Sequence, residues 1–143
     1  MAHQRALLEP SSLEIAFAWF QRVMAGYCLL FGILYWVRLI GLFPGPLWRF
    51  DLMPVHWQVA TAMLAVVLPF AAAGLWVLAS WGAVIWFICA ATETVMYAGL
   101  PQLFGDRRTV VAAHAAAALT YVVLRAAIYL RRRRAAREAA DGA

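Results

Sequence analysis

The chain has 143 residues, of which 66% are hydrophobic and 13% are charged, and its formal net charge is +5 at pH 7. Ordinary soluble domains contain about a quarter charged residues, so this chain has too few polar side chains to cover a soluble globule. The composition therefore excludes an ordinary soluble domain and indicates an integral membrane protein.

The positive charge does not indicate a nucleic-acid-binding protein, because five of the 12 arginines crowd together directly after an apolar segment. A basic cluster in that place is typical of the end of a membrane span. We expect it to fix the orientation of the chain and to contact anionic lipid headgroups. The five residues are Arg131, Arg132, Arg133, Arg134 and Arg137.

A long uncharged segment sets the number of spans. Residues 57–92 form 36 consecutive positions without a charged side chain, whereas one helical crossing needs about 20 residues. Two spans must therefore share this segment. The alanine-rich and leucine-rich runs do not alternate with a period of two, so the spans are predicted to be helices and not barrel strands.

The first predicted span covers residues 15–43. Ser11 and Glu14 have the spacing of a capping box, which predicts a helix start directly before the apolar run. The run stops at the Pro-Gly-Pro sequence of residues 44–46, where a turn is expected. The loop that follows, residues 43–54, is rich in aromatic side chains and is predicted to lie at the membrane interface.

The other spans are predicted at residues 55–78, 82–100 and 109–130. Pro69 lies inside the second span and predicts a kink there. The last span is rich in alanine, which lets helices approach closely in membranes. Together with a basic tail, residues 131–143, these segments predict that residues 1–143 form a single all-α membrane domain, a bundle of four transmembrane helices.

The distribution of arginine predicts the orientation of this bundle. Eight arginines lie on the side of the two termini and four lie on the side of the other two loops. By the positive-inside rule both termini are cytoplasmic, and we expect the chain in a bacterial inner membrane. Besides the five tail residues, the first group contains Arg5, Arg22 and Arg125, and the second contains Arg38, Arg49, Arg107 and Arg108.

Five polar side chains are predicted to lie at one level inside the membrane. At 1.5 Å per residue, Glu93 is about 10 Å deep, His114 about 9 Å and Arg38 about 8 Å. Gln58 and Thr61 enter the second span at similar levels. A charged side chain at the membrane centre costs about 2.5–3.5 kcal/mol, so each needs a partner. We therefore predict an intramembrane polar network to which all four helices contribute.

Helical spacing gives a second indication of the buried seam, because positions three, four or seven residues apart share one face of a helix. Each of three spans carries a stripe of this kind that includes a charged or histidine side chain. The stripes are Tyr27, Phe31, Tyr35 and Arg38, then Ala90, Glu93 and Tyr97, and finally His114, Ala118, Tyr121 and Arg125.

The polar network has two interpretations. In the first, Arg38, Glu93 and His114 neutralise one another and fix the register of the helices. In the second, Glu93 is a protonatable site and His114 relays its proton. A haem held by His56 and His114 is disfavoured, because His56 lies at the mouth of a span.

Nothing in the chain indicates catalysis. Cys28 and Cys89 lie in apolar segments without a Cys-x-x-Cys pair or a zinc-ligand spacing, so they are predicted to be packing residues. No nucleophile–base pair can be traced either. We therefore expect no enzyme activity, no metal and no cofactor. The loop at residues 48–58 is the segment dense enough in aromatic, charged and histidine side chains to hold a further site.

Several short sequences in the first loop and the third span are distinctive. They are Phe43-Pro44-Gly45, Trp48-Arg49-Phe50-Asp51-Leu52-Met53-Pro54, His56-Trp57-Gln58, Glu93 and Met96-Tyr97-Ala98-Gly99. These motifs resemble those of a family of small bacterial inner-membrane proteins of unknown function, and the resemblance covers about residues 15–130. The resemblance implies a four-helix membrane protein without an assigned activity. The size and span number are also similar to the DoxX-type membrane proteins, in architecture alone.

The sequence thus predicts a non-catalytic small subunit or assembly factor, which packs against itself or against a larger membrane complex. The alternative is a proton-coupled carrier or permease component that uses Glu93. The expected partners are the lipid bilayer and a membrane protein, and nucleic acid is not among them.

Overall fold

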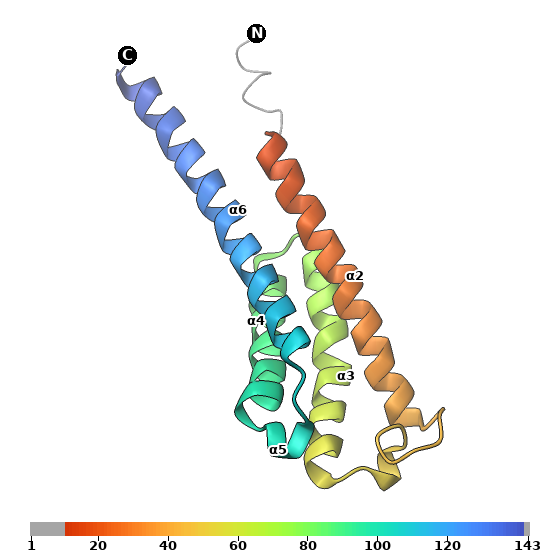
Figure 1. Ribbon diagram of the computed structural model, residues 1–143. Helices are drawn as coiled ribbons and strands as arrows, with labels where there is room; N and C mark the ends of the chain where they lie inside the picture. Colours follow the sequence, from red (N-terminus) through yellow and green to blue (C-terminus); the bar gives the residue numbers. More distant parts are fainter. Residues whose placement is uncertain (1–10, 142–143) are drawn as a thin grey trace.

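The computed structural model describes residues 11–141, which form an all-α bundle without a strand (Figure 1). Four of its helical segments are long and apolar enough to cross a membrane, which confirms the predicted all-α, four-span fold. The helical segments are α2 (Ser12–Ile40), η1 (Phe50–Leu52), α3 (Val55–Trp76), α4 (Ser80–Thr94), the π-helix η2 (Val95–Gly99), α5 (Pro101–Phe104) and α6 (Arg108–Asp141).

Helix α2 starts and α6 finishes at the same end of the bundle, here called the terminal end (Figure 1). The opposite end, which carries residues 41–54 and α5, is called the loop end. The cytoplasmic placement of the terminal end stays a prediction. Arg5, which contributed to that prediction, lies outside the described residues.

The boundaries of α2 follow from its sequence. The Ser11 hydroxyl accepts a hydrogen bond from the Glu14 backbone N–H, and the Glu14 carboxylate accepts one from the Ser11 N–H, so the predicted capping box is formed. The helix ends at Ile40, earlier than the predicted residue 43. Gly41 ends it by adopting a left-handed conformation with φ of 71°.

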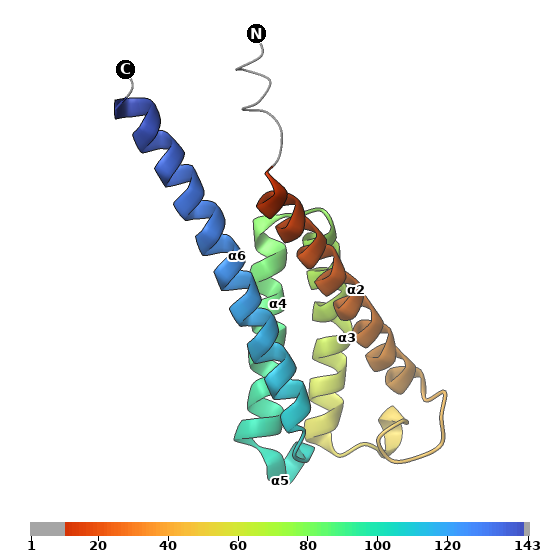
Figure 2. The ribbon, with the colours of Figure 1, turned by 45° about the horizontal axis from the view of Figure 1, so that its top comes forward.

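The last two spans differ from regular apolar helices. α4 passes at Val95 into the π-helix η2, which ends at Gly99 and so completes the third span. α6 continues beyond the predicted residue 130 through the basic tail to Asp141. Alanine and arginine are strong helix formers, so the helix persists where the apolar sequence stops. Both views show this extension beyond the other helices (Figure 2).

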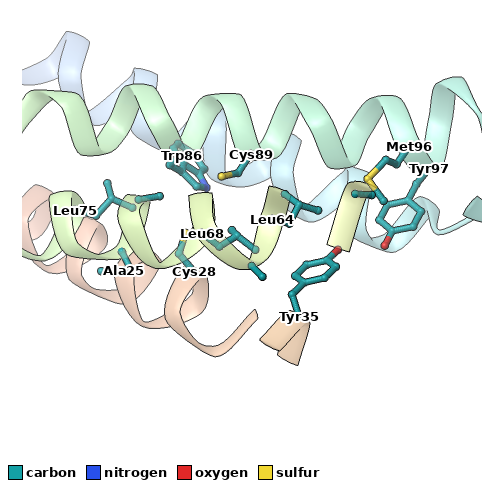
Figure 3. Close-up of a cluster of buried hydrophobic side chains, with 14 of the residues drawn as sticks. Ala25, Cys28, Tyr35, Leu64, Leu68, Leu75, Trp86, Cys89, Met96 and Tyr97 are labelled. Carbon is teal, nitrogen blue, oxygen red and sulfur yellow. The ribbon is translucent and has the colours of Figure 1, made fainter. Parts of the chain in front are cut away.

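The core of the bundle lies around α3. Half of the apolar stretch of α3 is buried, against 22% of that of α2 and 11% of that of α6. Figure 3 shows Leu64 and Leu68 of α3 between Cys28 of α2 and the side chains Trp86 and Cys89 of α4. The two cysteines are buried, free thiols in this cluster. Helix α6 therefore packs on the outside of a core made by α2, α3 and α4.

Two close approaches between helices depend on glycine. A Cβ atom added to Gly32 of α2 would lie 2.8 Å from ring carbons of Pro69 in α3. A Cβ atom added to Gly82 of α4 would overlap the backbone of Gly74 in α3. In membranes, where no hydrophobic effect drives helices together, such close contact is a main source of helix association. The glycines therefore position α2 and α4 against α3.

The substitution Gly82→Ala is expected to lower the free energy of unfolding by about 1–3 kcal/mol, because the added methyl group overlaps the backbone of α3. Gly26→Ala is the matched control, since a Cβ atom there meets nothing within 4 Å. The control is expected to leave stability unchanged or slightly higher. Unfolding in mixed detergent micelles measures both variants, and equal stabilities would contradict the close approach of α3 and α4.

Candidate functional site

Glu93 is the centre of a buried polar cluster at the loop end. It lies in the last turn of α4 and is 3% exposed. The Tyr35 hydroxyl of α2 donates a hydrogen bond of 3.0 Å to its Oε1, and His114 Nε2 of α6 lies 2.7 Å from its Oε2. His114 is itself 5% exposed. One carboxylate thus joins three helices through both of its oxygen atoms.

The helix that carries Glu93 changes its geometry directly after it. Residues 95–99 form the π-helix η2, in which the Leu100 N–H bonds to the Val95 carbonyl, and the segment buries Met96 and Tyr97. π-helical turns are rare and occur frequently at functional sites. The polar cluster therefore lies beside an interruption of its own transmembrane helix.

Arg38 lies at the same end but makes no hydrogen bond or ion pair with Glu93. Its guanidinium carbon lies 5.1 Å from the ring centre of Trp48, 5.4 Å from that of Tyr35 and 5.5 Å from that of Trp57. Its Nε atom is buried and has no hydrogen-bond partner among the described residues. Arg38 is thus held by cation–π contacts with three aromatic side chains.

Gln58 and Thr61 take part in a different set of contacts. Gln58 donates a hydrogen bond of 3.0 Å from its side-chain amide to the carbonyl oxygen of Phe50. The fully buried Thr61 hydroxyl lies 3.8 Å from the sulfur atom of Met53. Both residues connect the start of α3 to the loop at residues 41–54. Of the five residues of the predicted network, the structure joins Glu93 directly to His114 alone.

Two arginine side chains, Arg38 and Arg107, line one cavity beside Glu93. The cavity has a volume of about 280 Å³ and lies between α2, the end of α4 with η2, and the start of α6. Arg107, in the loop before α6, holds its guanidinium carbon 5.5 Å from the ring centre of Tyr97. The lining residues are Phe31, Leu34, Tyr35, Arg38, Trp48, Glu93, Tyr97, Arg107 and Val110.

Three residues that contact the cluster or line its cavity do not belong to the predicted network: Tyr35, Tyr97 and Arg107. Tyr35 and Tyr97 share the predicted helix stripes of Arg38 and Glu93, and that spacing is the signal for including them. Arg107 enters the sequence prediction only through its charge, which helps to set the orientation in the membrane. Its place beside the cavity depends on how residues 105–107 turn into α6, which helical periodicity does not describe.

A family model for a family of unknown function (DUF6163) matches residues 15–132 of this chain. The chain belongs to this family. Membership confirms the predicted resemblance to a family of unknown function and assigns no activity to the cluster around Glu93. No curated protein and no solved structure was found to match the chain. The likeness to DoxX-type proteins is not among these findings and stays a prediction.

The other candidate residues of this DUF6163 chain lie apart from the Glu93 cluster. His56 Nε2 lies 3.0 Å from the carbonyl oxygen of Leu103 in α5, so it connects two elements of the loop end. Residues 11–141 contain no group of three His, Cys, Asp or Glu side chains suited to a metal ion. The five tail arginines are all exposed on α6, and among them Arg132 forms an ion pair with Glu14 of α2.

The loop of residues 41–54 carries its own ion pair. Arg49 and Asp51 form a salt bridge with an N–O distance of 2.6 Å, and both side chains are about half exposed or more. The Arg49 guanidinium holds the pKa of Asp51 below its usual value. Because the pair is exposed, it contributes little to the stability of the fold.

The substitution Tyr35→Phe is expected to lower the free energy of unfolding by about 1 kcal/mol, because it removes a buried hydrogen bond to Glu93 without changing the ring. Tyr129→Phe is the matched control, because Tyr129 is exposed on α6. It is expected to leave stability unchanged. The two variants are compared by unfolding in mixed micelles, and a loss of the same size in both would remove the assigned role of the Tyr35 hydroxyl.

Proposed function

We propose that this chain is a non-enzymatic membrane protein that binds and releases a proton at Glu93, as a component of a proton-coupled carrier or permease. The observation that carries the proposal is that, among the described residues, the two oxygens of the buried carboxylate form hydrogen bonds with Tyr35 and His114 and with no arginine. A tyrosine hydroxyl is neutral at ordinary pH, and histidine is charged only while it holds an extra proton. The net charge of the cluster therefore depends on one proton.

A structural network in which Arg38 neutralises Glu93, as the first interpretation of the sequence has it, has less support. Arg38 is the arginine predicted for that role, and it contacts aromatic rings instead. The Glu93–His114 pair is neutral overall when it holds one shared proton. Removing that proton leaves a net negative charge inside an apolar bundle, which is costly. A pair of this kind suits a site that changes its charge.

The surroundings of Glu93 also suit a carrier. Although it is buried, Glu93 belongs to the wall of a cavity. α4 changes into the π-helix η2 just after Glu93. Interrupted helices with polar groups beside a cavity are common at the binding sites of membrane transporters.

The substitution Glu93→Gln tests whether the carboxylate titrates. Infrared difference spectra of the reconstituted protein, recorded between acidic and alkaline pH, are expected to contain a carboxyl band in the wild type that is lost in Glu93→Gln. Glu138→Gln, on the exposed tail, is the control and is expected to keep this band.

The same variants give a transport readout, for which anions are the trial solutes because Arg38 and Arg107 line the cavity beside Glu93. In proteoliposomes with a pH-sensitive dye inside, addition of phosphate or a small carboxylate is expected to start proton uptake in the wild type and in Glu138→Gln but not in Glu93→Gln. Gel filtration checks that each variant is folded. Identical spectra and identical proton uptake in a folded Glu93→Gln protein would overturn the proposal.

A second candidate, a small subunit or assembly factor of a membrane complex, is favoured by the packing of α6. Only His114 and Ile128 are buried among the described residues of this helix. The exposed positions near its start include several alanines, whose small side chains allow another helix to approach closely. The excess of arginine at the terminal end further supports an orientation with both termini in the cytoplasm, and the bacterial inner membrane remains part of the proposal, as the resemblance in the sequence implies.

A pull-down in mild detergent tests the second candidate. If α6 docks on a partner, the tagged wild type is expected to bring down a stoichiometric membrane protein, and Ala116→Trp is expected to lose it by blocking close approach. Val66→Trp, on the exposed face of α3, is the control. Recovery of the chain without any partner from its native membrane would rule this candidate out.

A further inference from the structure

The loop end carries four arginines, and they divide into two kinds. Arg49 is paired with Asp51 at 2.6 Å, and Arg108 is paired with Asp106 at 2.9 Å. Arg38 and Arg107 have no ion pair with any residue of the described chain, 11–141. The two unpaired arginines are also the two that line the cavity beside Glu93.

The aromatic contacts orient these two cations without using their hydrogen-bond donors. Arg38 lies over Tyr35, Trp48 and Trp57, and Arg107 lies over Tyr97. A guanidinium that contacts an aromatic face still has five N–H donors at its edge. The Arg38 Nε donor is buried and has no partner within the described chain. A buried donor without an acceptor is unfavourable, so an acceptor from outside the described residues would stabilise this atom.

Glu93 does not serve as that acceptor. Its two oxygens are already engaged by Tyr35 and His114. The cavity therefore has two guanidinium groups and one carboxylate in its wall, and the carboxylate is bonded to partners other than these arginines. This leaves a surplus of positive charge in a confined, partly apolar space, and an anion lowers the energy of such an arrangement.

The geometry points to a binding site for an oxyanion, either a phosphate or a carboxylate group, held between Arg38 and Arg107. This inference adds a ligand to the proposed function. The assignment of that ligand as the transported solute rests on the proposed function. Guanidinium groups bind planar or tetrahedral oxyanions by two parallel hydrogen bonds, which suits both ligand classes.

The rest of the lining limits what the anion is attached to. Phe31, Leu34, Trp48 and Val110 give the cavity apolar walls, and its volume of about 280 Å³ is slightly below the usual range for ligand sites, about 300–1,000 Å³. A small organic acid or a phosphate ester with a short apolar part fits these walls. The phosphate group of an anionic lipid has the same chemistry, with its acyl chains outside the cavity.

The test measures anion binding to the purified full chain at one fixed pH. Inorganic phosphate and acetate are titrated in a thermal-shift assay, and lipid retention is measured by native mass spectrometry after mixing with phosphatidylglycerol or phosphatidylcholine. The wild type is expected to be stabilised by a soluble anion or to retain phosphatidylglycerol preferentially. A response to phosphate or acetate identifies a soluble solute, whereas a response to phosphatidylglycerol alone identifies a lipid headgroup.

The variant Arg107→Gln is expected to weaken this binding about tenfold, the size of one lost charge-assisted contact. Its matched control is Arg108→Gln, which removes the same charge from the neighbouring residue and is expected to bind as the wild type does. Arg107 lies exposed in a loop, so its substitution is compatible with folding. Arg38→Gln is a second variant with the same expected direction.

Two results would overturn the inference. One is a wild-type protein that responds to neither soluble anion and does not prefer the anionic lipid. The other is an equal loss of binding in Arg107→Gln and Arg108→Gln, which indicates surface charge in general. Because binding is measured at fixed pH, its failure is distinguishable from a failure of proton exchange at Glu93, which the infrared spectra report separately.

Discussion

The cost of burying one carboxylate governs the loop end of this bundle. An ionised side chain among apolar helices is tolerated only where hydrogen bonds replace its lost water. Glu93 obtains such contacts from Tyr35 on α2 and His114 on α6. The contact with His114 adds to the packing of α6, which has only one other fully buried side chain among its described residues, Ile128, and several partly buried ones. The same contact that replaces the lost water of the carboxylate therefore helps to join the fourth helix to the core.

The four helices are held in two physically different ways. α2, α3 and α4 meet through close packing at glycine, which depends on shape and is insensitive to pH. α6 packs on the core through side chains that are only partly buried, such as Tyr121, and adds directional polar contacts, to Glu93 near its start and from Arg132 to Glu14 at the terminal end. The proton exchange proposed at Glu93 would therefore change the charge at a contact between α4 and α6.

Local rules were sufficient to predict much of this fold from the sequence. The capping box at Ser11 and Glu14 depends only on residues that are close in the sequence. The number of spans in the uncharged residues 57–92 follows from the thickness of the bilayer. The meeting of Glu93 and His114 also follows from a simple quantity, their similar depth from one membrane surface. Spacing and depth therefore locate which helices share a polar layer.

Spacing and depth do not predict which partner each side chain in that polar layer contacts. A guanidinium accepts either a carboxylate or an aromatic face as its neighbour, and Arg38 takes the aromatic faces because Trp48 of the loop and Trp57 of α3 both reach it. Gln58 and Thr61 likewise contact the loop at residues 41–54. The depth of a residue in the membrane does not predict the path of such a loop. The π-helix η2 has no sequence signature of its own. Each of these features depends on tertiary contacts with the irregular segment at residues 41–54 or with α6.

The separation of the arginines from Glu93 has a consequence for how a ligand and a proton interact. The oxyanion proposed between Arg38 and Arg107 would lie in the same small cavity whose wall contains Glu93. Its negative charge would disfavour a second, unprotonated negative group nearby. Because linkage is reciprocal, a proton on the Glu93–His114 pair would in turn favour the bound anion. Had Arg38 been paired with Glu93, a permanent cation would have neutralised the carboxylate, and this coupling between anion and proton would be largely lost.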